Sequence, residues 1–206
     1  ALFGWDGLKK LGRKPQTPNG EVGTGAGTKC LSCGELLIKK TLEEKLEVCP
    51  ACGHHHRVDA WRRIDITLDP DTFAERDADL TSQDILAFRA AKAYKDVLER
   101  DQAKTGLRSA MVGGTGRLAG RPVAFGVTDS RFLMGSMGSV VGEKIKRLAE
   151  RALDSEDPLV LVCASGGARM QEGIFSLMQM AKTAAALEQL HEARVPYVSV
   201  LTHPTT

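Results

Sequence analysis

The chain has 206 residues, of which 42% are hydrophobic and 26% charged, and its formal net charge is +2 at pH 7. This hydrophobic content excludes a disordered protein, and a charge so close to zero does not by itself indicate a nucleic-acid binder. No run approaches the roughly 18–20 apolar residues needed to cross a bilayer, so we expect no transmembrane helix.

Residues 1–28 are predicted to form a flexible leader and linker. The segment from Ala1 to Lys14 is mildly basic but lacks the apolar stretch of a signal peptide. Residues 15–28 are rich in proline and glycine, which is typical of a linker. Without a targeting segment, the default expectation is a cytoplasmic protein. The chain begins with Ala and ends directly after an apolar strand, so we expect a fragment of a longer protein.

Four of the five cysteines form two C-x-x-C pairs, Cys30 with Cys33 and Cys49 with Cys52. Two such pairs at this separation are typical of a structural zinc site, because the two turns together supply four soft ligands in a tetrahedron. With every position taken by the protein, no place is left for a reactive water. We therefore predict a zinc ribbon over residues 29–58 with these four cysteines as metal ligands.

Other interpretations of the cysteines stay open. Two disulfides would require an oxidising compartment, for which the sequence has no targeting segment. A single-iron site with four thiolates is a further alternative, and His54, His55 or His56 could replace one ligand. Between the cysteine pairs, residues 35–38 and 45–48 are predicted to pair as two short strands.

After the ribbon, helices and strands alternate. Ser82 or Asp84 could cap a helix that runs to about Ala103, and Gly113–Gly116 is predicted to be a turn. The later elements are a strand at 122–128, a helix at 139–154, a strand at 159–164, a helix at 170–193 and a strand at 196–201. This alternation predicts an α/β fold with a mainly parallel sheet.

Two glycine-containing loops each precede a helix. They are residues 135–139, Gly-Ser-Met-Gly-Ser, and residues 165–169, Ser-Gly-Gly-Ala-Arg. Glycine lets backbone amides face outward, and a helix N-terminus adds partial positive charge, so such a loop could hold a phosphate or an oxyanion. Neither loop matches a P-loop or the dinucleotide fingerprint. For each loop alone, a tight strand-to-helix turn is the simpler explanation.

Side-chain machinery for catalysis is not evident. Cys163 lies in a short apolar run and is predicted to be a small core residue rather than a nucleophile. The sequence contains no metalloprotease motif, Gly-x-Ser-x-Gly elbow or kinase signature. If the protein is an enzyme, its catalysis is therefore expected to use backbone donors.

Several segments resemble the beta subunit of the carboxyltransferase of bacterial and plastid acetyl-CoA carboxylase. They are KTGL at 104–107, GSMGSVVGEK at 135–144, ASGGARMQEG at 164–173, SLMQMAK at 176–182 and SVLTHPTT at 199–206. A four-cysteine ribbon before such a domain is similar to the enzymes with separate subunits. The resemblance covers about residues 29–206.

The resemblance implies a crotonase-like carboxyltransferase domain, of which residues 59–206 would be the N-terminal part. The implied reaction moves a carboxyl group from carboxybiotin, held on a biotin carboxyl carrier protein, to acetyl-CoA. The product is malonyl-CoA, in the first committed step of fatty acid synthesis. The resemblance also implies one structural zinc ion per chain, an alpha subunit in an α2β2 heterotetramer, and biotin carboxylase as a further partner.

The resemblance extends to site residues. The backbone N–H groups of Gly166 and Gly167 would stabilise the enolate oxygen of the thioester. Substrate contacts would come from the two loops, at Gly135, Ser136, Gly138, Ser165, Ala168 and Arg169. Three positions depart from the family pattern: Met134 replaces a usual Gly, His203 a usual Asp and Cys163 a usual Ser.

An alternative function is a zinc ribbon that binds nucleic acid. The ribbon and its surroundings carry the basic residues Lys39, Lys40, Arg57, Arg62 and Arg63. RNA binding could also be a second role of the same protein. The simpler explanation is that these charges are solvated or face the phosphates of CoA.

Overall fold

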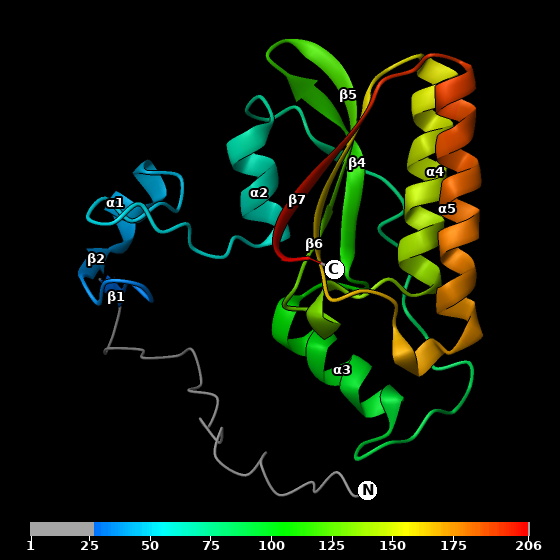
Figure 1. Ribbon diagram of the computed structural model, residues 1–206, viewed down its shortest axis with the longest axis horizontal. Coiled ribbons are helices and arrows are strands. Elements are labelled where there is room, and N and C mark those ends of the chain that lie inside the picture. The colour runs from blue at the N-terminus through cyan, green and yellow to red at the C-terminus, as the bar shows by residue number, and fades with distance from the viewer. Residues whose placement is uncertain (1–26, 206) are drawn as a thin grey trace, which may run out of the picture. The chain divides into compact units, whose positions relative to one another are not determined.

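A computed structural model describes residues 27–205, which form two compact units divided between His56 and Arg57 (Figure 1). The first 26 residues of the predicted leader and linker lie outside the described part of the chain. Within residues 27–205, no helix is both long enough and apolar enough to cross a bilayer.

The small unit is built on a two-stranded antiparallel sheet. Strand β1 (Gly27–Lys29) pairs with β2 (Leu36–Ile38), and helix α1 (Lys39–Glu44) follows directly. The predicted strand at 45–48 is wrong, because this segment forms the turns that end α1, and only Val48 makes a bridge, to His55. Four side chains are buried: Cys30, Leu37, Leu42 and Cys49. Such a small core gives little stability of its own.

The larger unit contains a five-stranded sheet with the order β3-β4-β5-β6-β7. The strands are β3 (Ala74–Glu75), β4 (Met111–Leu118), β5 (Arg121–Thr128), β6 (Leu159–Ser165) and β7 (Tyr197–Thr205). β5, β6 and β7 are parallel, as the alternation of elements predicts. β3, β4 and β5 pair antiparallel, so the prediction of a mainly parallel sheet holds only for the second half of the unit.

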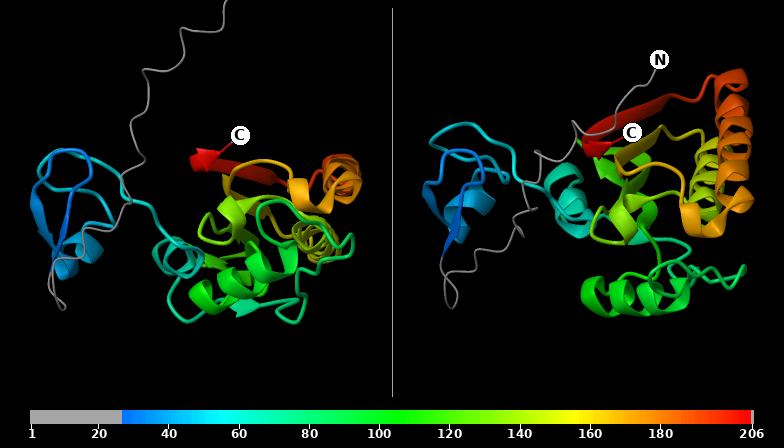
Figure 2. Two further views of the ribbon diagram at one scale, coloured as in Figure 1. Left: turned by 90° about the horizontal axis from the view of Figure 1, so that it is seen from below. Right: turned by 60° about the horizontal axis from the view of Figure 1, so that its bottom comes forward.

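Helices cover both faces of this sheet. α4 (Ser139–Ser155) and α5 (Ile174–Glu192) lie side by side on one face, and α2 (Ala60–Thr67) lies on the other (Figures 1 and 2). α3 (Tyr94–Thr105) lies at the end of the sheet where β4 begins. The predicted helix from Ser82 or Asp84 begins only at Tyr94, because Asp84 instead accepts a hydrogen bond from the Phe88 amide in an irregular segment.

The glycines at 113–116 belong to strand β4 and not to the predicted turn. Their missing side chains leave room for neighbours on both faces of the sheet. A Cβ at Gly113 would lie 2.7 Å from a methyl group of Leu148 in α4, and one at Gly116 would lie 2.8 Å from Leu68 after α2. Glycine therefore lets the helical layers approach the sheet closely here.

Candidate functional site

The four cysteines of the ribbon meet in one cluster, with all four sulfur atoms within 4.8 Å of one another. The Sγ atoms of Cys30 and Cys52 are 3.7 Å apart, and those of Cys33 and Cys49 are 3.8 Å apart. Four zinc–sulfur bonds of about 2.3 Å in a tetrahedron place the sulfur atoms about 3.8 Å from one another. The cluster therefore fits a tetrahedral zinc ion, and the neighbouring histidines are not part of it.

Two equivalent turns present these sulfur atoms. The amide of Gly34 donates to the carbonyl of Cys30 at 3.0 Å, and the amide of Gly53 donates to that of Cys49 at 2.9 Å. Both glycines have positive φ angles, of +75° and +71°, which glycine adopts without strain. With four thiolate ligands on such turns, the site is closed, as expected of a structural metal.

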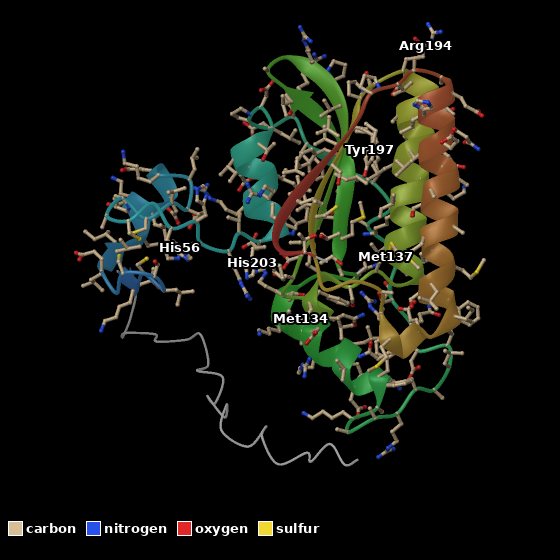
Figure 3. All side chains as sticks on the ribbon, viewed as in Figure 1. His56, Met134, Met137, Arg194, Tyr197 and His203 are labelled. Carbon is tan, nitrogen blue, oxygen red and sulfur yellow. The ribbon has the colours of Figure 1, made fainter. Side chains whose placement is uncertain are left out.

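The two glycine-containing loops, which are far apart in sequence, lie against each other in the larger unit. Met137 forms a parallel bridge with Ala168, in which its amide donates to the Gly167 carbonyl and its carbonyl accepts from the Arg169 amide, both at 2.9 Å. Met134 and Met137 lie at the end of the sheet where β6 and β7 end (Figure 3). Ligands of open α/β sheets commonly bind at this edge.

The amides of Gly166 and Gly167 are already hydrogen bonded in this structure. Gly166 N–H donates to the Met134 carbonyl at 2.8 Å, and Gly167 N–H donates to the Ser165 hydroxyl at 3.1 Å. Each amide has only one proton to donate. The two groups therefore differ from the free, outward-facing donors that the sequence suggests, and the Gly166 amide joins the two loops.

The neighbouring amide of Ala168 has a different environment. Ala168 is exposed, and its N–H has no hydrogen-bond partner among residues 27–205. Gly167 precedes it with a φ of +93°, a conformation that favours glycine. The accessible donors of this loop are thus Ala168 and, after rotation of one hydroxyl, Gly167.

Most of the predicted substrate contacts are buried. Gly135, Ser136 and Gly138 are all buried, and a Cβ at Gly135 would overlap the carbonyl oxygen of Ala164. Arg169 is only 1% exposed, and its guanidinium group donates to protein atoms alone. In this structure these four residues lie inside the protein and shape the loops from within. Of the predicted contacts, Ser165 and Ala168 retain access to solvent.

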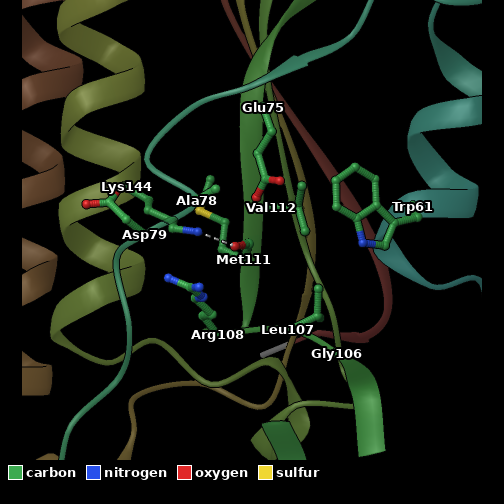
Figure 4. Close-up of a pocket in the computed structure, with 10 residues that line it drawn as sticks. All are labelled: Trp61, Glu75, Ala78, Asp79, Gly106, Leu107, Arg108, Met111, Val112 and Lys144. Atoms are coloured by element: carbon green, nitrogen blue, oxygen red, sulfur yellow. Dashed lines mark hydrogen bonds between the residues drawn. The ribbon is translucent and has the colours of Figure 1, made fainter. Parts of the chain in front are cut away.

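Neither of two cavities in the larger unit borders these loops. One cavity, of about 420 Å³, has Trp61, Arg108 and the buried Lys144 in its walls (Figure 4). Burial lowers the pKa of Lys144, whose ammonium group donates to the Met111 carbonyl at 3.0 Å. The other, of about 470 Å³, lies between the end of α5 and Tyr197. In the candidate site, Gly166 and Ala168 are exposed and Gly167 between them is half-buried.

Sequence reasoning missed two residues that contact the loops, Glu172 and Tyr94. Glu172 accepts a hydrogen bond from the Ser139 amide at 2.6 Å, and Tyr94 donates to Glu172 at 2.8 Å. Glu172 lies inside a segment that resembles the family, but nothing local marks a charged residue as buried. Tyr94 is 78 residues away from its partner, and no sequence signal connects the two.

Two family models match the chain. Residues 55–206 match the carboxyl transferase domain, and residues 28–52 match the acetyl-CoA carboxylase zinc finger domain. The larger unit therefore belongs to the carboxyl transferase domain family, with a crotonase-like α/β fold, and the four-cysteine ribbon before it is a structural zinc site.

Among solved structures, the transcarboxylase 12S hexamer matches with a TM-score of 0.58 and 28% identity, over 71% of this chain and 26% of that one. A malonate decarboxylase hetero-tetramer from Pseudomonas matches with a TM-score of 0.54 and 27% identity, over 71% of this chain and 51% of that one.

Curated relatives specify the class further. The acetyl-coenzyme A carboxylase carboxyl transferase subunit beta of Citrifermentans bemidjiense is 52% identical over 90% of this chain and 66% of its own length. The subunit beta of Acaryochloris marina is 50% identical over 100% of this chain and 68% of its own length. The chain belongs to the family of acetyl-CoA carboxylase carboxyltransferase beta subunits. It spans about two thirds of the length of these relatives.

Proposed function

We propose that the complete protein transfers a carboxyl group from carboxybiotin to acetyl-CoA and so forms malonyl-CoA. The observation that carries this proposal is the paired-loop site itself, found in a chain about half identical to named beta subunits. An exposed loop at the end of β6 offers amide protons where a thioester oxygen could lie. The site needs no side-chain nucleophile for this chemistry.

In the proposed reaction, cleavage of the N–CO₂⁻ bond of carboxybiotin gives CO₂ and leaves negative charge on the biotin ureido group. That nitrogen takes a proton from the methyl group of acetyl-CoA, and the thioester becomes an enolate. The enolate carbon then attacks CO₂, which gives malonyl-CoA. Amide donors at the enolate oxygen bind the transition state more tightly than the ground state, and losing one such donor costs on the order of 3 kcal/mol.

The donors follow from the hydrogen bonds of the loop. Gly167 releases its amide when the Ser165 hydroxyl turns away, and Ala168 presents its amide directly. Gly166 contributes only if its bond to Met134 opens, so we assign the main roles to Gly167 and Ala168. If the Ser165 hydroxyl only occupies the resting site, Ser165→Ala should keep kcat within about threefold. A hundredfold loss would instead make the hydroxyl itself a donor.

The reaction is tested with the full-length protein, an alpha subunit and a carboxybiotin-loaded carrier protein, by measuring malonyl-CoA. The control replaces the protein by a beta subunit that is active with the same partners. Product from the control but none from this protein would refute the proposed function.

The partners are proposed on similar grounds. The exposed side of α5 carries apolar side chains that are 44–61% exposed, at Ile174, Phe175, Leu177, Met178 and Met180. A helix that is apolar on its outer side is typical of one buried in an assembly. This supports an alpha subunit as partner. The carrier protein and biotin carboxylase would complete the assembly. Free thiolates in the ribbon fit the cytoplasm, where thiolates stay reduced. If the assembly is an α2β2 heterotetramer, light scattering should give a mass equal to that of two alpha and two beta subunits.

RNA binding by the ribbon is a separate hypothesis with weaker support. Residues 27–56 contain four lysines and four glutamates, so their formal charge is zero with histidine neutral. Lys39 pairs with Glu43 on the exposed face of α1. Binding that weakens steeply between two salt concentrations would support an RNA site, and salt-independent or absent binding would exclude it.

A further inference from the structure

A buried cluster of polar side chains connects the two loops of the candidate site. Arg169 and Glu172 are each 1% exposed, and Tyr94, Ser82 and Ser136 are also buried. Burying two charged groups in a protein is unfavourable unless each one is closely hydrogen bonded. The hydrogen bonds of these side chains hold several elements together.

Arg169 fixes the first loop through a single residue. Its Nε donates to the Ser136 hydroxyl at 3.1 Å, and its Nη2 donates to the Ser136 carbonyl at 2.6 Å. Its Nη1 lies within hydrogen-bonding distance of Ser82 and Tyr94. The planar guanidinium group can serve these directions at once, whereas the ammonium group of a lysine cannot reproduce this fork.

Glu172 fixes the start of helix α4. One carboxylate oxygen accepts the amide proton of Ser139, the first residue of α4, at 2.6 Å, and the other accepts the hydroxyl of Tyr94 at 2.8 Å. The residue before α4, Gly138, has no side chain that could cap the helix, and a Cβ there would overlap Glu172. The carboxylate thus replaces the missing cap from 33 residues away.

The tyrosine completes the cluster as a donor. Burial, with a further contribution from the charge of Glu172, raises the pKa of Tyr94 above its usual range, although Arg169 lowers it. The hydroxyl therefore stays protonated and continues to donate its hydrogen bond to the Glu172 carboxylate. Tyr94 is the first residue of α3, so the cluster also attaches a third element to the two loops.

We propose that Arg169, Glu172 and Tyr94 are positioning residues, which set the donor amides of residues 167–168 against the loop at 134–138. Arg169 is the last residue of the donor loop and Glu172 lies three residues after it, and their side chains hold the opposite loop and the start of α4. A shift in either side chain would move the amides relative to a bound thioester. This inference rests on the proposed carboxyl transfer.

The test compares Tyr94→Phe and Glu172→Gln with Lys144→Met in the full-length protein assembled with its alpha subunit. Lys144 is also buried and polar, but its ammonium group donates to the Met111 carbonyl, away from the loops. Glu172→Gln should lower kcat at least tenfold and Tyr94→Phe about threefold to tenfold, with KM for acetyl-CoA changed less than threefold. Lys144→Met should leave kcat within twofold.

Thermal unfolding of each variant separates positioning from stability. The Tyr94 and Glu172 variants are compared with a Lys144 variant that has the same melting temperature. If they lose no more activity than that variant, the proposal is overturned. Amide hydrogen exchange gives a readout that does not depend on activity. Glu172→Gln should speed exchange at Ser139 and Gly166, and unchanged exchange at both would also overturn the proposal. If the wild-type protein is inactive but Glu172→Gln still speeds exchange at Ser139 and Gly166, only the proposed carboxyl transfer is refuted.

Discussion

Replacing Gly135 with alanine tests how closely the two loops pack. Gly135 has a φ of +68°, and a Cβ at this position would overlap the carbonyl oxygen of Ala164 at the end of β6. A left-handed backbone costs an L residue about 1–2 kcal/mol, and overpacking costs about 1–3 kcal/mol. We therefore expect Gly135→Ala to lower the free energy of unfolding by about 2–5 kcal/mol.

Gly120→Ala is a matched control, because Gly120 also has a positive φ, of +77°, but a Cβ there would meet no atom within 4 Å. Its expected cost is that of the backbone alone, about 1–2 kcal/mol. Urea unfolding followed by circular dichroism measures both variants. With a slope of about 2 kcal/mol per molar, Gly135→Ala should lower the midpoint by about 1–2.5 M. Equal midpoints would refute the constraint from Ala164.

Three further predictions concern the metal, an acidic group and a thiol. Chelating zinc should unfold residues 27–56 alone, because only four side chains are buried there, and limited proteolysis that cuts residues 57–205 first would contradict this. Burial raises the pKa of Asp129, but hydrogen bonds from Arg131 and the Ala60 amide outweigh it and leave the pKa below its usual range. The stability from this carboxylate is therefore present at neutral pH and lost below about pH 4, so Asp129→Asn should flatten the dependence of the urea midpoint on pH there. Partial burial raises the pKa of the half-buried Cys163, so iodoacetamide at pH 7 should label it more slowly than a peptide cysteine, and labelling at the peptide rate would contradict this.

The bounds of elements with a clear apolar pattern could be predicted from the sequence to within one residue. The helix expected at 139–154 is α4 at Ser139–Ser155, and the strand expected at 159–164 is β6 at Leu159–Ser165. In both cases the apolar side chains of the pattern are buried in the core or packed against it. Local sequence and tertiary packing therefore favour the same structure.

Strand β4 could not be recognised in the same way. Three of its eight residues are glycines, which in isolation are typical of a turn. The reason for them lies in distant side chains, since Leu148 and Leu68 occupy the space that a Cβ would need. Helix α2 was also missed, although Asp59 caps it by accepting from the Arg62 amide at 2.9 Å.

At the candidate site, the sequence predicted the loops but not the state of their amides. The partner of the Gly166 amide, Met134, is 32 residues earlier in the chain, and no local pattern reveals that bond. Met134 itself has a φ of +58°, which explains physically why glycine would suit its position. The burial of Arg169 was equally hidden, because surface arginines and buried ones look alike in a sequence.

Strand β7 has a practical consequence for anyone who prepares this chain in isolation. Among residues 27–205 it pairs only with β6, and Tyr197, Val198, Val200 and Leu201 are exposed along it. A nine-residue edge with unpaired peptide groups and apolar side chains is a template for strand addition. Preparations should therefore associate as concentration rises.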